Sequence, residues 1–331
     1  MSFVERFDMG DRSPRRVEFV QEILPRLSEI TTSVIPTADS ETIDFPCTGM
    51  NGVVWYVNYQ TENIEWVTVV LKANLDTDLL RAQAAAMRAY AKNGISVPAL
   101  VEREETETNP YLHIMEFVDR PLLSSIPVAD RIANGTSLEM GVLLGRGHLK
   151  GFDGFGSLDP DKPGIVGRHD TFSAHIQEEV IDRRLLPLIK AEYLNETAME
   201  QAIIARDVLD QDLGNGQKPV LVNVDFSPNN VFFGEPEESL IVFDPKPKIS
   251  HPLLDLANTL INSISYTENW DEAHEIIEGY ESFEGKVDMK VLDAAMYLMI
   301  IYKMHSFWKK GKTERSGRLR GILENIEVVN I

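Results

Sequence analysis

Val222-Asn223-Val224-Asp225-Phe226-Ser227-Pro228-Asn229-Asn230, followed by Ile241-Val242-Phe243-Asp244, is the most informative part of this chain. Asp225 and Asn230 stand five apart in a loop that contains proline. Short apolar runs lie before this loop, directly after it and just ahead of Asp244, and each is typical of a strand. The turn residues between the last two runs predict a hairpin. Such a hairpin brings Asn230 and Asp244 to the same end.

These three side chains are the groups that phosphoryl transfer from ATP requires. Asp225 would orient an acceptor hydroxyl and accept its proton. Asn230 and Asp244 would hold Mg²⁺ through oxygen ligands. The spacing of Asp225 and Asn230 alone is common by chance, and Ser-Pro followed by Asn-Asn is ordinary turn chemistry. The flanking strands favour the catalytic interpretation.

Residues 221–260 resemble the catalytic region of the aminoglycoside phosphotransferase-like kinases, a group with antibiotic, homoserine, choline and fructosamine kinases among its members. The pattern there is His-Gly-Asp, four residues, Asn, and then a hydrophobic strand that ends in Asp. Asp225, Asn230 and Asp244 match this pattern, and Asp255-Leu256-Ala257 matches an Asp-Leu-Ala at the start of the next helix. Asn223 stands where the family has His. We expect Asn223 to support the loop, because an amide both donates and accepts hydrogen bonds.

The resemblance extends to the N-terminal half, where it implies a nucleotide-binding site. A glycine-bearing turn, with Gly49, Asn51 and Gly52, would cover the phosphates, because glycine permits close approach of the backbone. Lys72 ends a β-branched strand and would contact the α- and β-phosphates. The alternative interpretation of Lys72 is an ordinary lysine on an edge strand.

A helix over residues 76–92 should follow, with Asp76 or Thr77 as its cap and Gly94 as its stop. The family has a glutamate in this helix that pairs with the lysine, but here no acid lies between Asp78 and Glu102. Gln83 is therefore the expected partner of Lys72. The resemblance also implies that adenine binds to backbone groups near Glu116 and Val118.

Composition narrows the class of protein. The chain has 331 residues, of which 43% are hydrophobic and 25% are charged, as is usual for globular proteins. The N-terminus lacks an apolar signal core, and no apolar run reaches the length of about 18 residues that a membrane span needs. A single cysteine fits a reducing cytoplasm. The net charge of −20 argues against nucleic acid as a partner.

The same charge favours a cationic acceptor, such as an amino sugar or an aminoglycoside-like antibiotic. Acidic side chains in the C-terminal half are candidates for binding it: Asp153, Glu268, Asp271, Glu272 and Glu275. The alternative is that these acids form a solvated face.

We therefore expect an α+β, bilobal, protein-kinase-like fold. A β-rich lobe over residues 1–117 would bind ATP, and a mostly helical lobe over residues 118–331 would hold the catalytic loop. The expected reaction transfers the γ-phosphoryl group of Mg·ATP to a hydroxyl of a small molecule. Two alternatives stay open: a kinase of a metabolite such as a sugar, an amino alcohol or homoserine, and a nucleotide-binding pseudokinase with a regulatory role. The oligomeric state is open as well.

Overall fold

The computed structural model of the protein describes residues 14–23, 26–35, 38–44, 52–60, 66–106, 110–234, 240–267, 270–326 and 328. Gly49, Asn51 and Glu268 of the predicted site lie outside these residues. The chain forms two compact units. The first contains Met1–Met87 and Val97–Asp119, and the second contains Arg88–Ser96 and Arg120–Ile331.

An antiparallel sheet forms the centre of the first unit. Its strands follow the order β1-β2-β3-β5-β4. They are β1 (Ala38–Asp44), β2 (Gly52–Gln60), β3 (Trp66–Asn74), β5 (Leu112–Glu116) and β4 (Leu100–Arg103). Alternation in β2 buries Val53, Trp55 and Val57 on one face. The same alternation in β3 buries Leu71 and Ala73 and turns Lys72 to the opposite face.

Three helices accompany this sheet. The helices α1 (Pro14–Ile23) and α2 (Leu27–Val34) contribute Ile23, Leu27 and Ile30 to the core that contains Trp55. Next along the chain comes α3 (Thr77–Lys92), whose end belongs to the second unit. Asp76 caps α3 by accepting a hydrogen bond from Leu79 N at 3.0 Å, as expected of an acid at this position. Gly94 follows the helix with a φ of +76° and stops it, also as expected.

A second five-stranded sheet lies inside the second unit, in the order β6-β9-β12-β7-β8. Its strands are β6 (Leu149–Lys150), β9 (Val220–Asn223), β12 (Pro247–Ser250), β7 (Phe155–Leu158) and β8 (Gly167–His169). All four residues of β9 are buried, which explains its continuous apolar sequence. A separate hairpin pairs β10 (Val231–Phe232) with β11 (Ile241–Val242).

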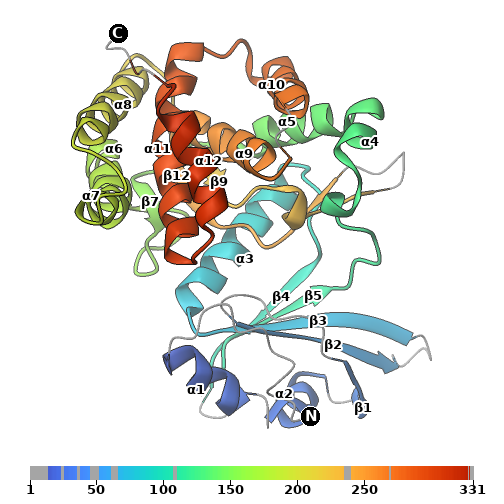
Figure 1. Ribbon diagram of the computed structural model, residues 1–331. Helices are drawn as coiled ribbons and strands as arrows, with labels where there is room; N and C mark the ends of the chain where they lie inside the picture. The colour runs from blue at the N-terminus through green and yellow to red at the C-terminus, as the bar shows by residue number, and fades with distance from the viewer. Residues whose placement is uncertain are drawn as a thin grey trace. The chain divides into compact units, whose positions relative to one another are not determined.

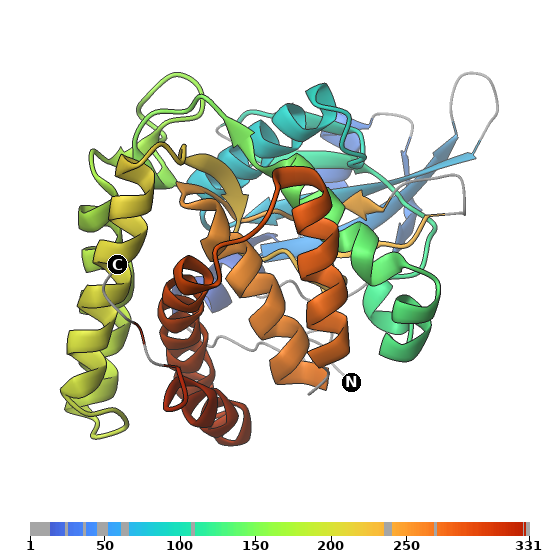
Figure 2. The same ribbon diagram turned by 90° about the horizontal axis from the view of Figure 1, so that it is seen from above.

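Helices make up most of the second unit. The longer ones are α5 (Thr136–Gly147), α8 (Thr197–Gly214), α9 (Pro252–Thr267), α10 (Trp270–Glu284), α11 (Met289–Lys309) and α12 (Thr313–Leu323). Because α11 is buried along most of its length, it reads as apolar nearly all round. It packs against α8, α9 and α12 (Figures 1 and 2). The shorter helical segments are η3 (Leu123–Ser125), α4 (Val128–Ala133), α6 (Phe172–Ile176), α7 (Leu186–Lys190) and η5 (Pro228–Asn230).

One helical segment has an unusual form. Residues Gln177–Leu185, η4, are a π-helix that continues α6 and runs into α7. The helical path is then interrupted at residues 191–196 before α8 begins. Across the described part of the chain, no helix is both long and apolar enough to span a bilayer.

Candidate active site

The loop that carries Asp225 leaves the end of the buried strand β9. Asn223, the last residue of β9, is 3% exposed. Its Oδ1 accepts hydrogen bonds from Asp225 N at 3.2 Å and from Lys246 N at 2.9 Å. Its backbone N donates to Asp255 Oδ2 at 2.6 Å. One amide side chain therefore ties the Asp225 loop to the segment that follows Asp244.

The β10–β11 hairpin brings the next two residues of the motif together. Val231 pairs with Val242, and Phe243 N donates to Asn230 O at 3.1 Å, so Asn230 lies beside the segment that ends at Asp244. Asn230 Nδ2 donates to Asp225 O at 2.8 Å. Asp244 has a φ of +50°, in the left-handed region that non-glycine residues rarely adopt. The expected convergence of Asn230 and Asp244 is therefore present.

Lys246 is a site residue that the sequence analysis missed. Its Nζ lies 2.6 Å from Asp225 Oδ2, and both side chains are about one third exposed, at 35% and 30%. Burial alone would lower the pKa of Lys246, but Asp225 and, less strongly, Asp244 outweigh it and raise the pKa. Lys246 could have been identified from the sequence by its position two residues after Asp244, in the segment that returns alongside Asn223.

A buried polar layer lies beneath the loop. Asp255, in the first turn of α9, is 1% exposed. Its Oδ2 lies 3.5 Å from His148 Nε2, and His148 Nδ1 is 3.1 Å from the hydroxyl of Tyr280. Burial, followed by Glu284 and Asp255, raises the pKa of Tyr280, so this hydroxyl stays protonated. The layer holds Asn223 in place through Asp255. His148 could not be assigned from sequence, because its partners are distant in the chain.

In the first unit, the expected contact between Lys72 and Gln83 is present. Lys72 Nζ donates to Gln83 Oε1 at 3.0 Å. Gln83 is 2% exposed, whereas Lys72 is only partly buried. A neutral amide here orients the ammonium group of Lys72 and leaves its charge in place. A carboxylate at the same position would cancel that charge.

The segment expected to bind adenine begins at Glu116, the last residue of β5. Glu116 N already donates to Ala99 O at 2.9 Å, and Glu116 Oε2 accepts from Ala99 N at 3.1 Å. The N–H of Glu116 is therefore engaged within the protein. Val118 lies beyond the sheet, outside any helix or strand.

The acidic residues considered for acceptor binding differ in their surroundings. Glu272 is 1% exposed, and its Oε1 accepts from Arg131 Nε at 2.8 Å. Ser263 also donates to this carboxylate. A carboxylate buried in such an ion pair cannot contact a ligand from solvent, so the expectation for Glu272 is corrected. Asp153 and Asp271 are exposed and Glu275 is half-buried.

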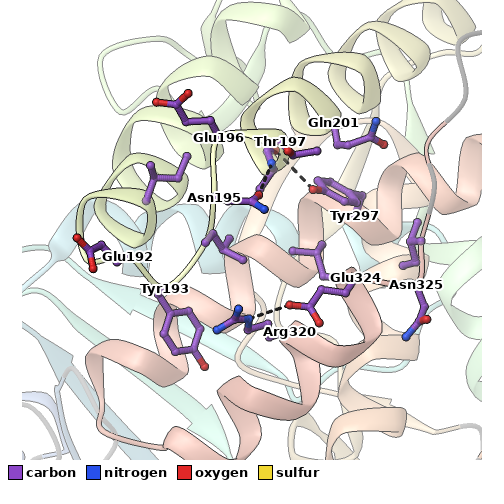
Figure 3. A pocket seen from close by; sticks show the side chains of 15 residues that line it. Glu192, Tyr193, Asn195, Glu196, Thr197, Gln201, Tyr297, Arg320, Glu324 and Asn325 are labelled. Carbon is purple, nitrogen blue, oxygen red and sulfur yellow. Dashed lines mark hydrogen bonds and ion pairs between the residues drawn. The ribbon is translucent and has the colours of Figure 1, made fainter.

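A large cavity of the second unit lies elsewhere. It has a volume of about 980 Å³ and is lined by residues of the 189–201 segment, by Tyr297 of α11 and by α12 with the residues that follow it. Figure 3 shows Arg320 and Glu324 beside Tyr193 in this cavity. None of the predicted site residues lines it. Cavity size therefore does not mark the site that the motif indicates.

The donor set around Asn230 fits magnesium. Because Asn230 Nδ2 is engaged by Asp225 O, its Oδ1 is left as an oxygen donor. Asp244 adds a carboxylate at the end of the same hairpin. Mg²⁺ is usually held by one or two protein oxygens, with phosphates and water as its remaining ligands. The two side chains meet that requirement.

No protein-family profile matches this chain, and no curated protein matches it in sequence. Solved structures do match it. A thermostable mutant of aminoglycoside phosphotransferase APH(4)-Ia, in ternary complex with AMP-PNP and hygromycin B, is 14% identical, with a TM-score of 0.65 over 91% of this chain and 97% of that one.

Two further structures match over a similar length. A protein assigned as a fructosamine-3-kinase from Thermobifida fusca is 16% identical, with a TM-score of 0.60 over 91% of this chain and 98% of that one. The amicoumacin kinase hAmiN, in complex with AMP-PNP, Ca²⁺ and Ami, is 14% identical, with a TM-score of 0.59 over 92% and 96%. The expected similarity of fold is confirmed. The chain has the same kinase-like fold as these small-molecule phosphotransferases.

Proposed function

We propose that the chain is an ATP- and Mg²⁺-dependent phosphotransferase that acts on a hydroxyl group of a small molecule. The observation that carries this proposal is the convergence of Asp225, Asn230 and the segment ending at Asp244 on one supported loop, in a fold shared with small-molecule kinases. The acceptor oxygen forms a bond to the γ-phosphorus, and the bond from that phosphorus to the β,γ-bridging oxygen breaks. ADP leaves with the bridging oxygen.

Each residue of the proposed site has one role. Asp225 orients the acceptor hydroxyl and takes its proton. Asn230 and Asp244 hold Mg²⁺, which neutralises charge on the transferring phosphoryl group when bound. Lys72, oriented by Gln83, neutralises the α- and β-phosphates. Gly49, Asn51 and Gly52 would cover the phosphates, and backbone groups near Glu116 and Val118 would bind adenine.

The finer expectation of a cationic acceptor has less support. It relied on the acids of α10, and Glu272 among them is buried against Arg131. It also relied on the net charge of −20, which is a property of the whole chain. The side chains next to Asp225 are a better guide to the acceptor, because electrostatic selection depends on the charges that the ligand meets.

The test is Asp225→Asn. We expect ATP consumption to fall by about 10²–10⁴-fold, the usual effect of losing a general base, while Mg·ATP binding survives because other residues hold the phosphates. The matched control is Asp161→Asn, which makes the same change in an exposed turn. Calorimetry with Mg·AMP-PNP measures binding, and ADP release with a panel of polyols measures turnover. Wild-type protein that binds the nucleotide but releases no ADP would support the pseudokinase alternative.

A further inference from the structure

A small cavity lies beneath the catalytic loop, inside the second unit. Its volume is about 20 Å³. Asn223 of β9 and Asp255 of α9 line it together with Tyr90 and Gly147, and its other lining residues are apolar. Asn223 is 3% exposed and Asp255 is 1% exposed, so both polar side chains are withdrawn from solvent. Hydrogen bonds made inside the protein therefore decide how favourable this arrangement is.

The hydrogen bonds of Asn223 fix the orientation of its amide. The terminal atom that accepts from both Asp225 N and Lys246 N must be the oxygen, so the other terminal atom is the NH₂ group. Among the residues that the structure describes, this buried Nδ2 has no protein acceptor. A buried N–H group without an acceptor is costly.

Asp255 has the complementary need. Its Oδ2 accepts a hydrogen bond from Asn223 N at 2.6 Å. Its Oδ1 is buried as well and, within the described part of the chain, receives no hydrogen bond from the protein. The two residues that line one cavity thus leave a donor on Asn223 and an acceptor on Asp255 to be satisfied.

The size and the chemistry of the cavity select its occupant. A cavity of roughly 10–15 Å³ or more can hold a water molecule, so this one admits a single water. A cation would face the N–H of Asn223 and an anion would face the carboxylate of Asp255, whereas water both donates and accepts. Tyr90 offers a third group, because burial, followed by Asp255, raises the pKa of its hydroxyl and keeps it protonated.

We propose that one structural water molecule binds in this cavity, where it accepts a hydrogen bond from Asn223 Nδ2 and donates one to Asp255 Oδ1. Asp255 then holds residue 223 at two points, the backbone N directly and the side chain through the water. The water thereby fixes the amide whose oxygen anchors Asp225 N. Its effect on turnover rests on the proposed phosphotransferase activity, but the water site itself does not.

Crystal structures of the wild type and of Asn223→His, at a resolution that shows ordered water, test the site directly. In the wild type we expect density for one water at about 3 Å from both Asn223 Nδ2 and Asp255 Oδ1. In Asn223→His we expect the imidazole, which is longer than the carboxamide, to take the place of this water. A wild-type cavity without that density, or an Nδ2 that donates to a protein atom, overturns the proposal.

A methyl group at residue 147 tests the same site by its effect on stability. Gly147 ends α5, and a Cβ there would have Ile95 Cδ1 and Tyr90 Cε1 as its nearest atoms, each at 3.9 Å. Both residues line the cavity, so the methyl group enters it without a clash and excludes the water. We expect Gly147→Ala to lower the urea midpoint, because a buried donor and a buried acceptor lose their shared partner.

Gly214→Ala is the matched control for this substitution. Gly214 ends α8, and a Cβ there meets nothing within 4 Å, so its urea midpoint should equal or exceed that of the wild type. A raised midpoint in Gly147→Ala overturns the proposal, because an added methyl group stabilises a cavity only if the cavity is dry.

Amide hydrogen exchange, followed by NMR, tests the positioning role. We expect the amides of Asp225 and Lys246 to exchange about tenfold faster in Gly147→Ala, relative to the amides of α8, and to be unchanged in Gly214→Ala. Unchanged exchange in Gly147→Ala contradicts the positioning role. Exchange does not depend on turnover, so a wild type that has these protected amides and yet releases no ADP rejects the phosphotransferase alone.

Discussion

Asn223 supports the catalytic loop through a single oxygen that accepts two backbone N–H groups. Asn223→Ala removes that acceptor from a buried position. We expect a loss of about 1–3 kcal/mol in the free energy of unfolding for each N–H left unsatisfied, and reduced turnover because Asp225 loses its anchor. Urea unfolding and ADP release measure the two effects.

Asn223→His provides the comparison for this residue. Imidazole also offers an acceptor nitrogen, so we expect this variant to remain folded and active where alanine fails. Complete loss of activity in Asn223→His would mean that the loop is built differently from the related kinases.

Asp244 should carry the metal dependence of nucleotide binding. In Asp244→Ala we expect the gain in ATP affinity produced by Mg²⁺ to disappear, because one of two protein ligands is missing. Calorimetry with and without EDTA measures this gain. Binding of metal-free ATP serves as the internal control and should be unchanged. Normal Mg·ATP affinity in a folded variant would mean that Asp244 has only a structural role in the turn and does not bind the metal.

For single residues, the sequence predicts those site residues that lie close together along the chain. Asp225, Asn230 and Asp244 are identifiable because a loop and a hairpin fix their separation along the chain. The ion pair between Arg131 and Glu272 is not, because its two residues lie far apart in the chain. The acidic run of α10 is ambiguous in sequence, since periodicity does not distinguish a solvated acid from one buried against arginine.

Two glycines set the contact between the helices α5 and α10. A Cβ on Gly279 would lie 1.9 Å from Leu138 O, and one on Gly141 would lie 2.0 Å from Ile276 O. Gly279→Ala therefore forces the helix backbones apart. We expect it to lower the free energy of unfolding by about 1–3 kcal/mol, the usual effect of overpacking.

The same substitution in α12 should have the opposite effect. A Cβ on Gly317 meets nothing within 4 Å, so Gly317→Ala should stabilise the protein by about 0.5–1 kcal/mol through helix propensity alone. Urea unfolding of the two variants side by side measures the contrast. A stabilising Gly279→Ala would mean that the helices are free to separate.

The sequence predicts most elements but not all of their forms. A cap at Asp76 and a glycine stop predict the bounds of α3, and the structure has both. Leu149 and Lys150 form the two-residue strand β6 against β9, and no pattern in the sequence predicts so short a strand. The π-helix η4 has no signal in the sequence, because its hydrogen bonding depends on packing against its neighbours.

On the scale of the whole molecule, acid should weaken the second unit before the carboxylates titrate. Burial, then Lys248, lowers the pKa of His175 to about 3. The unfolded chain, with an ordinary pKa of 6.5, binds this proton first as the pH falls. The stabilisation is complete above pH 6.5 and is lost progressively towards pH 3. At pH 5 the loss amounts to about 2 kcal/mol.

Urea midpoints at pH 7.5 and pH 5.0 measure this loss, and His175→Gln should reduce it. The pKa of His251 is also lowered, mainly by burial, so part of the pH dependence should remain. Glu179, with a pKa of about 2, adds acid sensitivity only at pH values below its ordinary 4.5. An identical pH dependence in wild type and His175→Gln would refute the role of His175.

The left-handed backbone at Asp244 has an evolutionary consequence. Glycine fits that conformation without steric cost, whereas an L-side chain gives up about 1 kcal/mol there. A lineage that no longer needed the carboxylate could gain stability through one codon change from aspartate to glycine. Mutation would then tend to erase the acid from any descendant that had become a pure binding module. The presence of aspartate at position 244 is therefore a marker that distinguishes catalytically active members of a lineage from inactive ones.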